Sequence, residues 1–198
     1  DTLRYHIGVA TYSVGVAYNN RKTSLQFIQQ EMNNITALSN ETCQLGIQSR
    51  NMVLYIAKKD SPQPIRLMSS VGKQLPLYCT GLGRALLAYK SEEEIRSLFP
   101  EVLTAYTPHT IATINDLLKE LELTRQRGYA VEHEETNLMV NCIAVSLDYN
   151  NAPIAALSIS IPTFRISESK EKEAVQILWE AKQHIETHFK MYGVDFGN

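Results

Sequence analysis

Three strand-like segments in the C-terminal half carry polar side chains where a buried strand is normally apolar. They lie between Gly128 and Pro162. Buried strands are lined by alternating or continuous apolar residues, and a buried polar group without a hydrogen bond costs about 1–3 kcal/mol. Several such groups on one face of a sheet predict a small polar pocket that a ligand completes. The interrupting residues are Glu132, Cys142, Ser158 and Ser160.

Composition is that of an ordinary globular protein. The chain has 198 residues, 44% hydrophobic and 20% charged, which suits a single buried core. No apolar run approaches the roughly 18 residues of a membrane span, and the first residues do not resemble a secretory signal. We therefore expect a cytoplasmic location without membrane contact. The start at Asp1, without Met, is expected for a piece of a longer protein.

Charge and cysteine usage exclude several classes of protein. Nineteen Lys and Arg against 21 Asp and Glu give a net charge of −2, and the basic residues are scattered. This distribution argues against direct nucleic-acid binding by these residues. Cys43, Cys79 and Cys142 are odd in number and far apart, so we expect free thiols and neither a disulfide framework nor a cysteine metal site.

Residue periodicity predicts an α+β domain, with a mainly antiparallel sheet flanked by helices. The first half begins with helices and continues with strands whose side chains alternate. Its predicted elements are a short helix over 6–20, an amphipathic helix from Ser24 capped by Thr23 or Ser24, a hairpin turning at Arg50-Asn51, and a third strand over Ile65 to Ser70.

The second half alternates helices with the three polar strands. Capping residues and glycines mark the helix ends, and Asn tolerates the positive φ of a hairpin turn. The predicted elements are a helix over Thr80 to Tyr89, a second with a Ser91/Glu94 capping box, an irregular stretch over 100–112, a helix from Thr113 to Gly128, a hairpin turning at Asn150-Asn151, and a long helix from Ser167 to about Gly193.

The start of the helix at Thr80 is a candidate anion site. It follows Pro76-Leu77-Tyr78-Cys79 and continues Gly81-Leu82-Gly83-Arg84. Unpaired amides at a helix start attract anions, and glycine lets a ligand approach the backbone. The alternative is a capped helix whose two glycines serve tight packing, and the motif by itself favours this alternative.

The other candidate sites have plain structural explanations. Cys142 as a nucleophile needs a nearby base, and a cysteine among apolar residues is more often a small buried hydrophobe. Around His133, alternation along a strand points Glu132 and Glu134 to one face and His133 to the other, which weakens a metal site there. His184 and His188 lie one helical turn apart without a HExxH motif, so a polar helix face is favoured.

Several motifs together resemble a known family. They are Pro76 to Ala88, Gly128 to Glu135, Cys142-Ile143-Ala144-Val145 and Leu157 to Pro162. In this order they are similar to the effector-binding domain of IclR-type bacterial transcription regulators, over nearly the whole chain. The resemblance implies a GAF-like fold, no enzymatic activity, no metal or other cofactor, and a pocket for a small carboxylate such as a 2-keto acid or sugar acid.

The resemblance also implies roles for particular residues. The amides of Thr80 and Gly81 hold the carboxylate, and Glu132, Cys142, Ser158 and Ser160 surround its remaining oxygens. Glu132 departs from the Asp found in some small-keto-acid binders, and it favours a ligand with a hydroxyl end. Arg66, with Val71-Gly72 and Pro76-Leu77-Tyr78, resembles the branch that responds to 2-keto-3-deoxygluconate-like acids.

By the same resemblance, residues 1–20 comprise the end of a missing DNA-binding domain and a linking helix, and residues 21–198 form the effector-binding domain. DNA is then contacted only through the missing winged-helix domain, as a repressor or activator that works as a homodimer or homotetramer. Exposed apolar residues on the first or last helix are expected at a subunit contact. The rival hypothesis is a cysteine-dependent hydrolase that uses Cys142 with Glu132 or His133.

Overall fold

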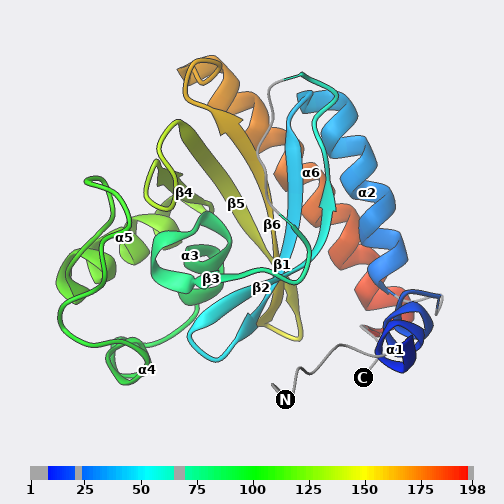
Figure 1. Cartoon of the computed structure of the whole chain (residues 1–198), viewed down its shortest axis with the longest axis horizontal. Coiled ribbons are helices and arrows are strands. Elements are labelled where there is room, and N and C mark those ends of the chain that lie inside the picture. Colours follow the sequence, from blue (N-terminus) through cyan, green and yellow to red (C-terminus); the bar gives the residue numbers. More distant parts are fainter. Residues whose placement is uncertain (1–8, 21–23, 65–69, 196–198) are drawn as a thin grey trace, which may run out of the picture.

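One antiparallel sheet with helices on both faces makes up the fold (Figure 1). The computed structural model describes residues 9–20, 24–64 and 70–195. Its strands are β1 (Thr42–Ser49), β2 (Met52–Lys59), β3 (Gln74–Pro76), β4 (Ala130–His133), β5 (Val140–Tyr149) and β6 (Ala152–Pro162). Its helices are α1 (Val9–Asn20), α2 (Ser24–Ser39), the single turn η1 (Leu77–Cys79), α3 (Gly81–Leu87), α4 (Glu92–Leu98), α5 (Ile114–Arg127) and α6 (Glu168–Tyr192).

The six strands run in the order β3-β2-β1-β6-β5-β4, and every neighbouring pair is antiparallel. The predicted α+β class is therefore confirmed. Both predicted hairpins are present, with left-handed backbone at Arg50 (φ 58°) and at Asn150 and Asn151 (φ 51° and 61°). The pairing of β1 with β6 joins the two halves of the chain and places Gln44 opposite Ser158.

The two faces of the sheet differ in the size of their side chains. On one face, large residues such as Ile143 and Leu157 form a core with α2 and α6. On the other face, Ala144 and Ala156 pack with α3 and α5, which Figure 1 shows on the side away from α2 and α6. Small residues at these positions let α3 approach the sheet, and the polar residues of β5 and β6 share this face.

Most helix ends follow the predicted signals. Thr80, Thr113 and Ser167 accept hydrogen bonds from backbone amides at the N-termini of α3, α5 and α6. Ser91 and Glu94 form the predicted capping box of α4. Gly128 ends α5 with a φ of 79°, a left-handed conformation that favours glycine. Local chemistry thus determines where these helices start and stop.

The N-terminal elements differ from expectation in detail. Residues 6–8 of the first predicted helix lie outside the described residues, as does Thr23. Ser24 does not cap α2, because its hydroxyl accepts from the Asp195 amide at 3.0 Å and donates to the Gly193 carbonyl at 3.4 Å. The start of α2 is thereby tied to the segment after α6.

Of two further predictions, only the second needs correction. Most of the third strand expected over Ile65 to Ser70 falls on residues 65–69, outside the described residues, and the strand next to β2 is β3 at Gln74–Pro76. The helix predicted to reach Tyr89 ends at Leu87.

Candidate functional site

Five of the six predicted site residues line one small cavity, of about 30 Å³, between α3 and the sheet. The sixth, Ser160, lies beside it, since its hydroxyl is 3.2 Å from the Cys142 sulfur and donates to Gln44 Oε1 at 3.0 Å. The lining residues are Thr80, Gly81, Glu132, Cys142 and Ser158 from the predicted set, with Gln44, Tyr55, Lys73, Leu75, Leu82, Thr136, Asn137 and Val140. The structure therefore gathers residues from both halves of the chain.

The start of α3 forms one wall of this cavity. The Thr80 hydroxyl accepts from the Gly83 amide at 3.1 Å and donates to the Pro76 carbonyl at 3.2 Å. The Thr80 amide makes only a long contact, 3.5 Å, with the Leu77 carbonyl. The first amides of a helix have no partner within the helix, so after capping the amides of Gly81 and Leu82 remain available in the described part of the chain.

Packing explains both glycines of α3. A Cβ on Gly81 would lie 3.3 Å from Cβ of Cys142, and a Cβ on Gly83 only 2.1 Å from the Leu77 carbonyl oxygen. Glycine is therefore needed for the close approach of α3 to β5 and to η1. The packing alternative raised by the sequence thus accounts for these glycines, without any need for a ligand.

Glu132 is buried, with 1% of its surface exposed. Its Oε1 atom accepts from the amides of Glu135, at 2.5 Å, and Thr136, at 3.2 Å. Burial raises the pKa of the Glu132 carboxyl above its usual value, and the amide hydrogen bonds only partly oppose this. Glu132 therefore has one oxygen committed to the backbone that follows β4.

Strand β4 ends one residue earlier than the alternation argument assumed. Glu134 has a φ of 56°, and its carboxylate accepts from the Met139 amide at 2.6 Å. It does not share a face with Glu132, so the predicted pairing of these two side chains is wrong. The second buried carboxylate is instead Glu135, while His133 is exposed.

The Cys142 thiol lacks the environment of a nucleophile. Burial, followed by the nearby Glu132 carboxyl, raises its pKa well above the ordinary value, whereas reactive cysteines have a lowered pKa. Its polar neighbours are Ser160 and the Glu132 carboxyl, and the His133 ring faces Asn141 at 3.0 Å. Nothing in the described residues supports the hydrolase hypothesis.

Ser158 has the least satisfied polar atom of the cavity. It is 1% exposed, and its Oγ finds no hydrogen-bond partner within the described part of the chain. Leaving such a group unpaired costs about 1–3 kcal/mol. The Ser160 hydroxyl already donates to Gln44 on the neighbouring strand. The Ser158 hydroxyl, by contrast, is available to a bound molecule.

A buried ion pair that the sequence did not predict lies behind the site. Arg84, on α3, donates to the carbonyls of Tyr78 and Val131, each at 2.9 Å, and pairs with Glu135. Glu135 also accepts from the Ile111 amide at 3.1 Å. The available signal was a single charged residue inside the apolar run Gly-Leu-Gly-Arg-Ala-Leu-Leu.

Neither the pair His184 and His188 nor the acidic residues around His133 form a metal-binding cluster among the described residues. No group of three or more possible ligands occurs among the residues at 9–20, 24–64 and 70–195. His184 contacts Glu31 at 3.4 Å, while His188 stacks on Phe27 with ring centroids 4.1 Å apart. Each histidine thus has its own neighbour on α2.

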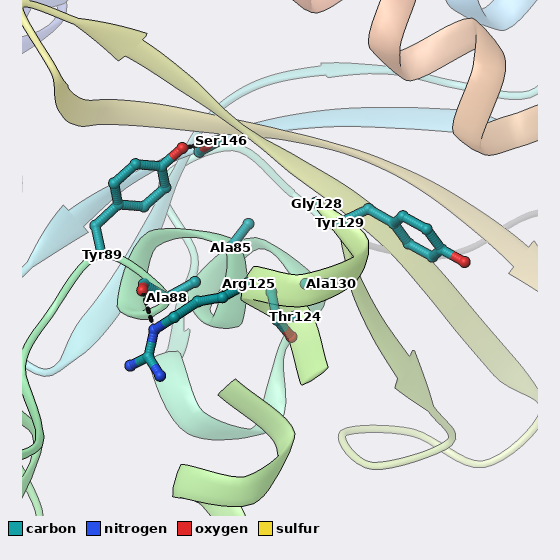
Figure 2. A pocket seen from close by; sticks show the side chains of 9 residues that line it. All are labelled: Ala85, Ala88, Tyr89, Thr124, Arg125, Gly128, Tyr129, Ala130 and Ser146. Atoms are coloured by element: carbon teal, nitrogen blue, oxygen red, sulfur yellow. Dashed lines mark hydrogen bonds between the residues drawn. The ribbon is translucent and has the colours of Figure 1, made fainter. Parts of the chain in front are cut away.

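A larger cavity, of about 340 Å³, lies elsewhere, between the ends of α3 and α5 and strand β5 (Figure 2). Alanines contribute to its lining, and Figure 2 shows two of its polar contacts: Ser146 to Tyr89 at 3.1 Å and Arg125 to the Ala88 carbonyl at 2.7 Å. None of the predicted residues lines it. Among the described residues, no buried polar side-chain atom without a partner belongs to this lining, whereas Ser158 provides one in the smaller cavity. The smaller cavity is therefore the better candidate site.

Known proteins share this sequence and fold. The family model described as "Bacterial transcriptional regulator IclR C-terminal" matches residues 17–187. The regulator KdgR of Dickeya chrysanthemi is 33% identical over 93% of this chain and 61% of its own length. The repressor AllR of Escherichia coli K12 is 32% identical, over 92% and 68%. Both are described as HTH-type regulators of transcription.

A solved structure extends the likeness to three dimensions. The IclR transcriptional regulator from Alicyclobacillus acidocaldarius superposes with a TM-score of 0.84 at 28% identity, covering 93% of this chain and 75% of that one. The chain thus spans about two thirds of the length of its relatives. None of its described helices has the length and apolar character needed to cross a bilayer.

Proposed function

The chain belongs to the IclR C-terminal family of bacterial transcriptional regulators, and from this premise we propose that it is a sensor that binds a small carboxylate. The observation that carries the proposal is the convergence of Thr80, Gly81, Glu132, Cys142 and Ser158 on one cavity. That cavity holds a buried hydroxyl without a partner, on Ser158. The named relatives are regulators rather than enzymes.

The ligand's carboxylate is placed at the start of α3. The amides of Thr80 and Gly81 donate to it, with the neighbouring amide of Leu82 in reach, as amides at a helix start do for anions. The Ser158 hydroxyl then gains a partner. The raised pKa of Glu132 favours its neutral form, which reduces repulsion of an acid bound nearby.

The cavity must enlarge to admit such a ligand. A volume of about 30 Å³ holds one or two water molecules. The segment from Glu134 to Val140 covers it through Thr136 and Asn137, and Glu132 tethers that segment through two amides. Entry of an acid is therefore coupled to movement of this segment and to the protonation of Glu132.

The ligand class is proposed at the level of 2-keto acids and sugar acids. KdgR and AllR are nearly equally similar to the chain, at 33% and 32% identity. Sequence identity therefore does not favour the KdgR branch of the family over the AllR branch. Arg66, which suggested the 2-keto-3-deoxygluconate branch, lies outside the described residues.

Regulation is proposed to act through a separate winged-helix domain. In this arrangement residues 1–20 join the two domains, and residues 21–198 sense the ligand as a homodimer or homotetramer. Apolar side chains are exposed on α1, at Val9 (80%) and Val14 (71%), and near the end of α6, at Tyr192 (76%). Such exposed apolar side chains support the proposed subunit contact. The ligand shifts DNA affinity only if it binds two arrangements of the protein unequally.

A thermal-shift screen tests the proposal. Glyoxylate, pyruvate, 2-oxoglutarate, gluconate and 2-keto-3-deoxygluconate are each added to the chain. A ligand of the folded state raises the melting temperature by mass action. We expect at least one acid to do so in a saturable way, and Ser158→Ala to reduce the shift. If no acid stabilises the chain, the assignment of this cavity fails.

A further inference from the structure

Two residues that line the cavity, Tyr55 and Lys73, have no assigned role. They come from the edge of the sheet formed by β2 and β3, across from the motif residues of α3, β4 and β5. The backbone of Tyr55 fixes them side by side. Its amide donates to the Lys73 carbonyl at 3.0 Å, and its carbonyl accepts from the Gly72 amide at 2.8 Å.

Tyr55 is a buried residue whose hydroxyl can donate a hydrogen bond. The residue is 7% exposed, and no hydrogen bond to its phenol oxygen occurs within residues 9–20, 24–64 and 70–195. Burial, followed by the nearby Cys142, Glu132 and Cys79, raises its pKa. The phenol therefore stays protonated and can donate to an oxygen inside the cavity.

Lys73 supplies positive charge at the mouth of the same cavity. It is exposed, and among the described residues it is the single Lys or Arg in the lining. Its ammonium forms no ion pair with any described residue. An ammonium has three donors and no acceptor, and a protonated phenol has one donor, so Lys73 and Tyr55 together favour an oxygen acceptor.

An ammonium beside a protonated phenol favours an oxygen acceptor on the ligand. We propose that Tyr55 and Lys73 bind the far end of the effector, and that this effector is a carboxylic acid longer than pyruvate with a second oxygen group remote from its carboxylate. The inference rests on the proposed function, which places the first carboxylate at α3. The remote group is either a second carboxylate or a distal hydroxyl, and both present the acceptor that these donors need.

Binding measurements on single variants test this assignment. The chain, Tyr55→Phe and Lys73→Gln are titrated by calorimetry with pyruvate, 2-oxoglutarate and 2-keto-3-deoxygluconate. The matched controls are Tyr192→Phe and Lys59→Gln, both exposed and outside the cavity. We expect one of the two longer acids to bind more tightly than pyruvate. Each cavity variant should weaken that acid by about tenfold or more, the range for a lost hydrogen bond to a charged partner.

Pyruvate separates the two hypotheses. Because it has no remote oxygen, its affinity should change less than twofold in either cavity variant, while Ser158→Ala weakens all three acids. Equal weakening of pyruvate and the longer acids, or no effect of Tyr55→Phe and Lys73→Gln on any acid, would overturn this inference and leave the proposed function standing. If none of the acids binds the unmodified chain, both fail.

The two longer acids reveal the nature of the remote group. If the remote group is a second carboxylate, 2-oxoglutarate binds more tightly and its affinity falls as the salt concentration rises. In Lys73→Gln this salt dependence disappears. A distal hydroxyl predicts that 2-keto-3-deoxygluconate binds more tightly and that salt has little effect on the Lys73 contribution. Either result supports the assignment of Tyr55 and Lys73.

Discussion

Arg84 and Glu135 form a buried ion pair between α3 and the segment that follows β4, with side chains 2% and 6% exposed. The pair lies directly behind the candidate site, because the Glu135 amide donates to the Glu132 carboxyl at 2.5 Å. It holds the helix start against the segment that covers the cavity. The position of the site thus depends on a contact between residues 51 positions apart.

Breaking this pair should destabilise the protein strongly. Arg84→Met leaves the Glu135 carboxylate buried without its partner, and such changes cost about 3–5 kcal/mol. Urea denaturation measures the loss of unfolding free energy. The double variant Arg84→Met/Glu135→Met should recover part of it, and Lys172→Met, in an exposed pair, should leave stability nearly unchanged. A double variant as unstable as the single one would show that packing, rather than the unpaired charge, dominates.

The stability contribution of Glu132 should depend on pH. Its pKa is raised in the folded state, so the folded protein binds the proton more tightly than the unfolded chain does. This contribution is present below the usual value of 4.5 and is lost as pH rises through the raised pKa. Glu132→Gln keeps an oxygen for the amides of Glu135 and Thr136 and does not titrate.

The stability of Glu132→Gln relative to the unmodified chain should therefore increase between pH 4.5 and neutral pH. Denaturant titrations across this range measure it, with Glu168→Gln, at an exposed site, as the control. A difference in unfolding free energy that stays constant with pH would contradict the raised pKa.

Gly83 should tolerate no side chain. The Cβ of Gly83→Ala meets the Leu77 carbonyl oxygen at 2.1 Å, and overpacking of this kind costs about 1–3 kcal/mol. Gly15→Ala is the control, since its Cβ would meet nothing within 4 Å and alanine favours a helix by about 1 kcal/mol over glycine. Thermal melts should show opposite signs for the two variants. A neutral Gly83→Ala would mean that α3 and η1 can separate.

The two serines of β6 should respond differently to removal of their hydroxyls. Ser158→Ala removes an unpaired buried oxygen, so the melting temperature without ligand should stay the same or rise. Ser160→Ala removes the donor to Gln44 Oε1 and should cost about 1 kcal/mol. Melting curves of the two variants decide this. A marked loss in Ser158→Ala alone would show that its hydroxyl already has a partner.

Cys142 should react slowly with thiol reagents in the folded chain. Burial raises its pKa well above the ordinary value, and it also raises the pKa of Cys79 to about 12. The thiolate, which is the reactive form, is therefore scarce at neutral pH. Labelling followed by mass spectrometry should modify Cys142 far more slowly than in denaturant. Fast labelling together with hydrolysis of a test ester would revive the hydrolase hypothesis.

Much of the site could be predicted because its residues belong to short sequence patterns, namely strand alternation and helix capping. The alternation of Leu157, Ser158, Ile159 and Ser160 places both hydroxyls on one face whatever the strand pairs with, and the structure has them there. Thr80 caps α3 through an amide only three residues away. That these residues contact a ligand stays a prediction, which the binding experiments test.

The remaining features depended on contacts distant in sequence. Nothing near Tyr55 or Lys73 indicates a pocket, and they reach it only because β1 pairs with β6 across the whole chain. Likewise, Glu135 rather than Glu134 is buried because β4 ends at His133 and the chain turns with positive φ at Glu134.

The α+β class, the helix caps, the hairpins and the polar face of β5 and β6 follow from residue patterns along the chain. These depend on interactions within a few residues. The folded arrangement establishes which polar groups face one another, which carboxylate is paired with Arg84 and how small the cavity is. These follow from packing, and packing is set by all the elements at once.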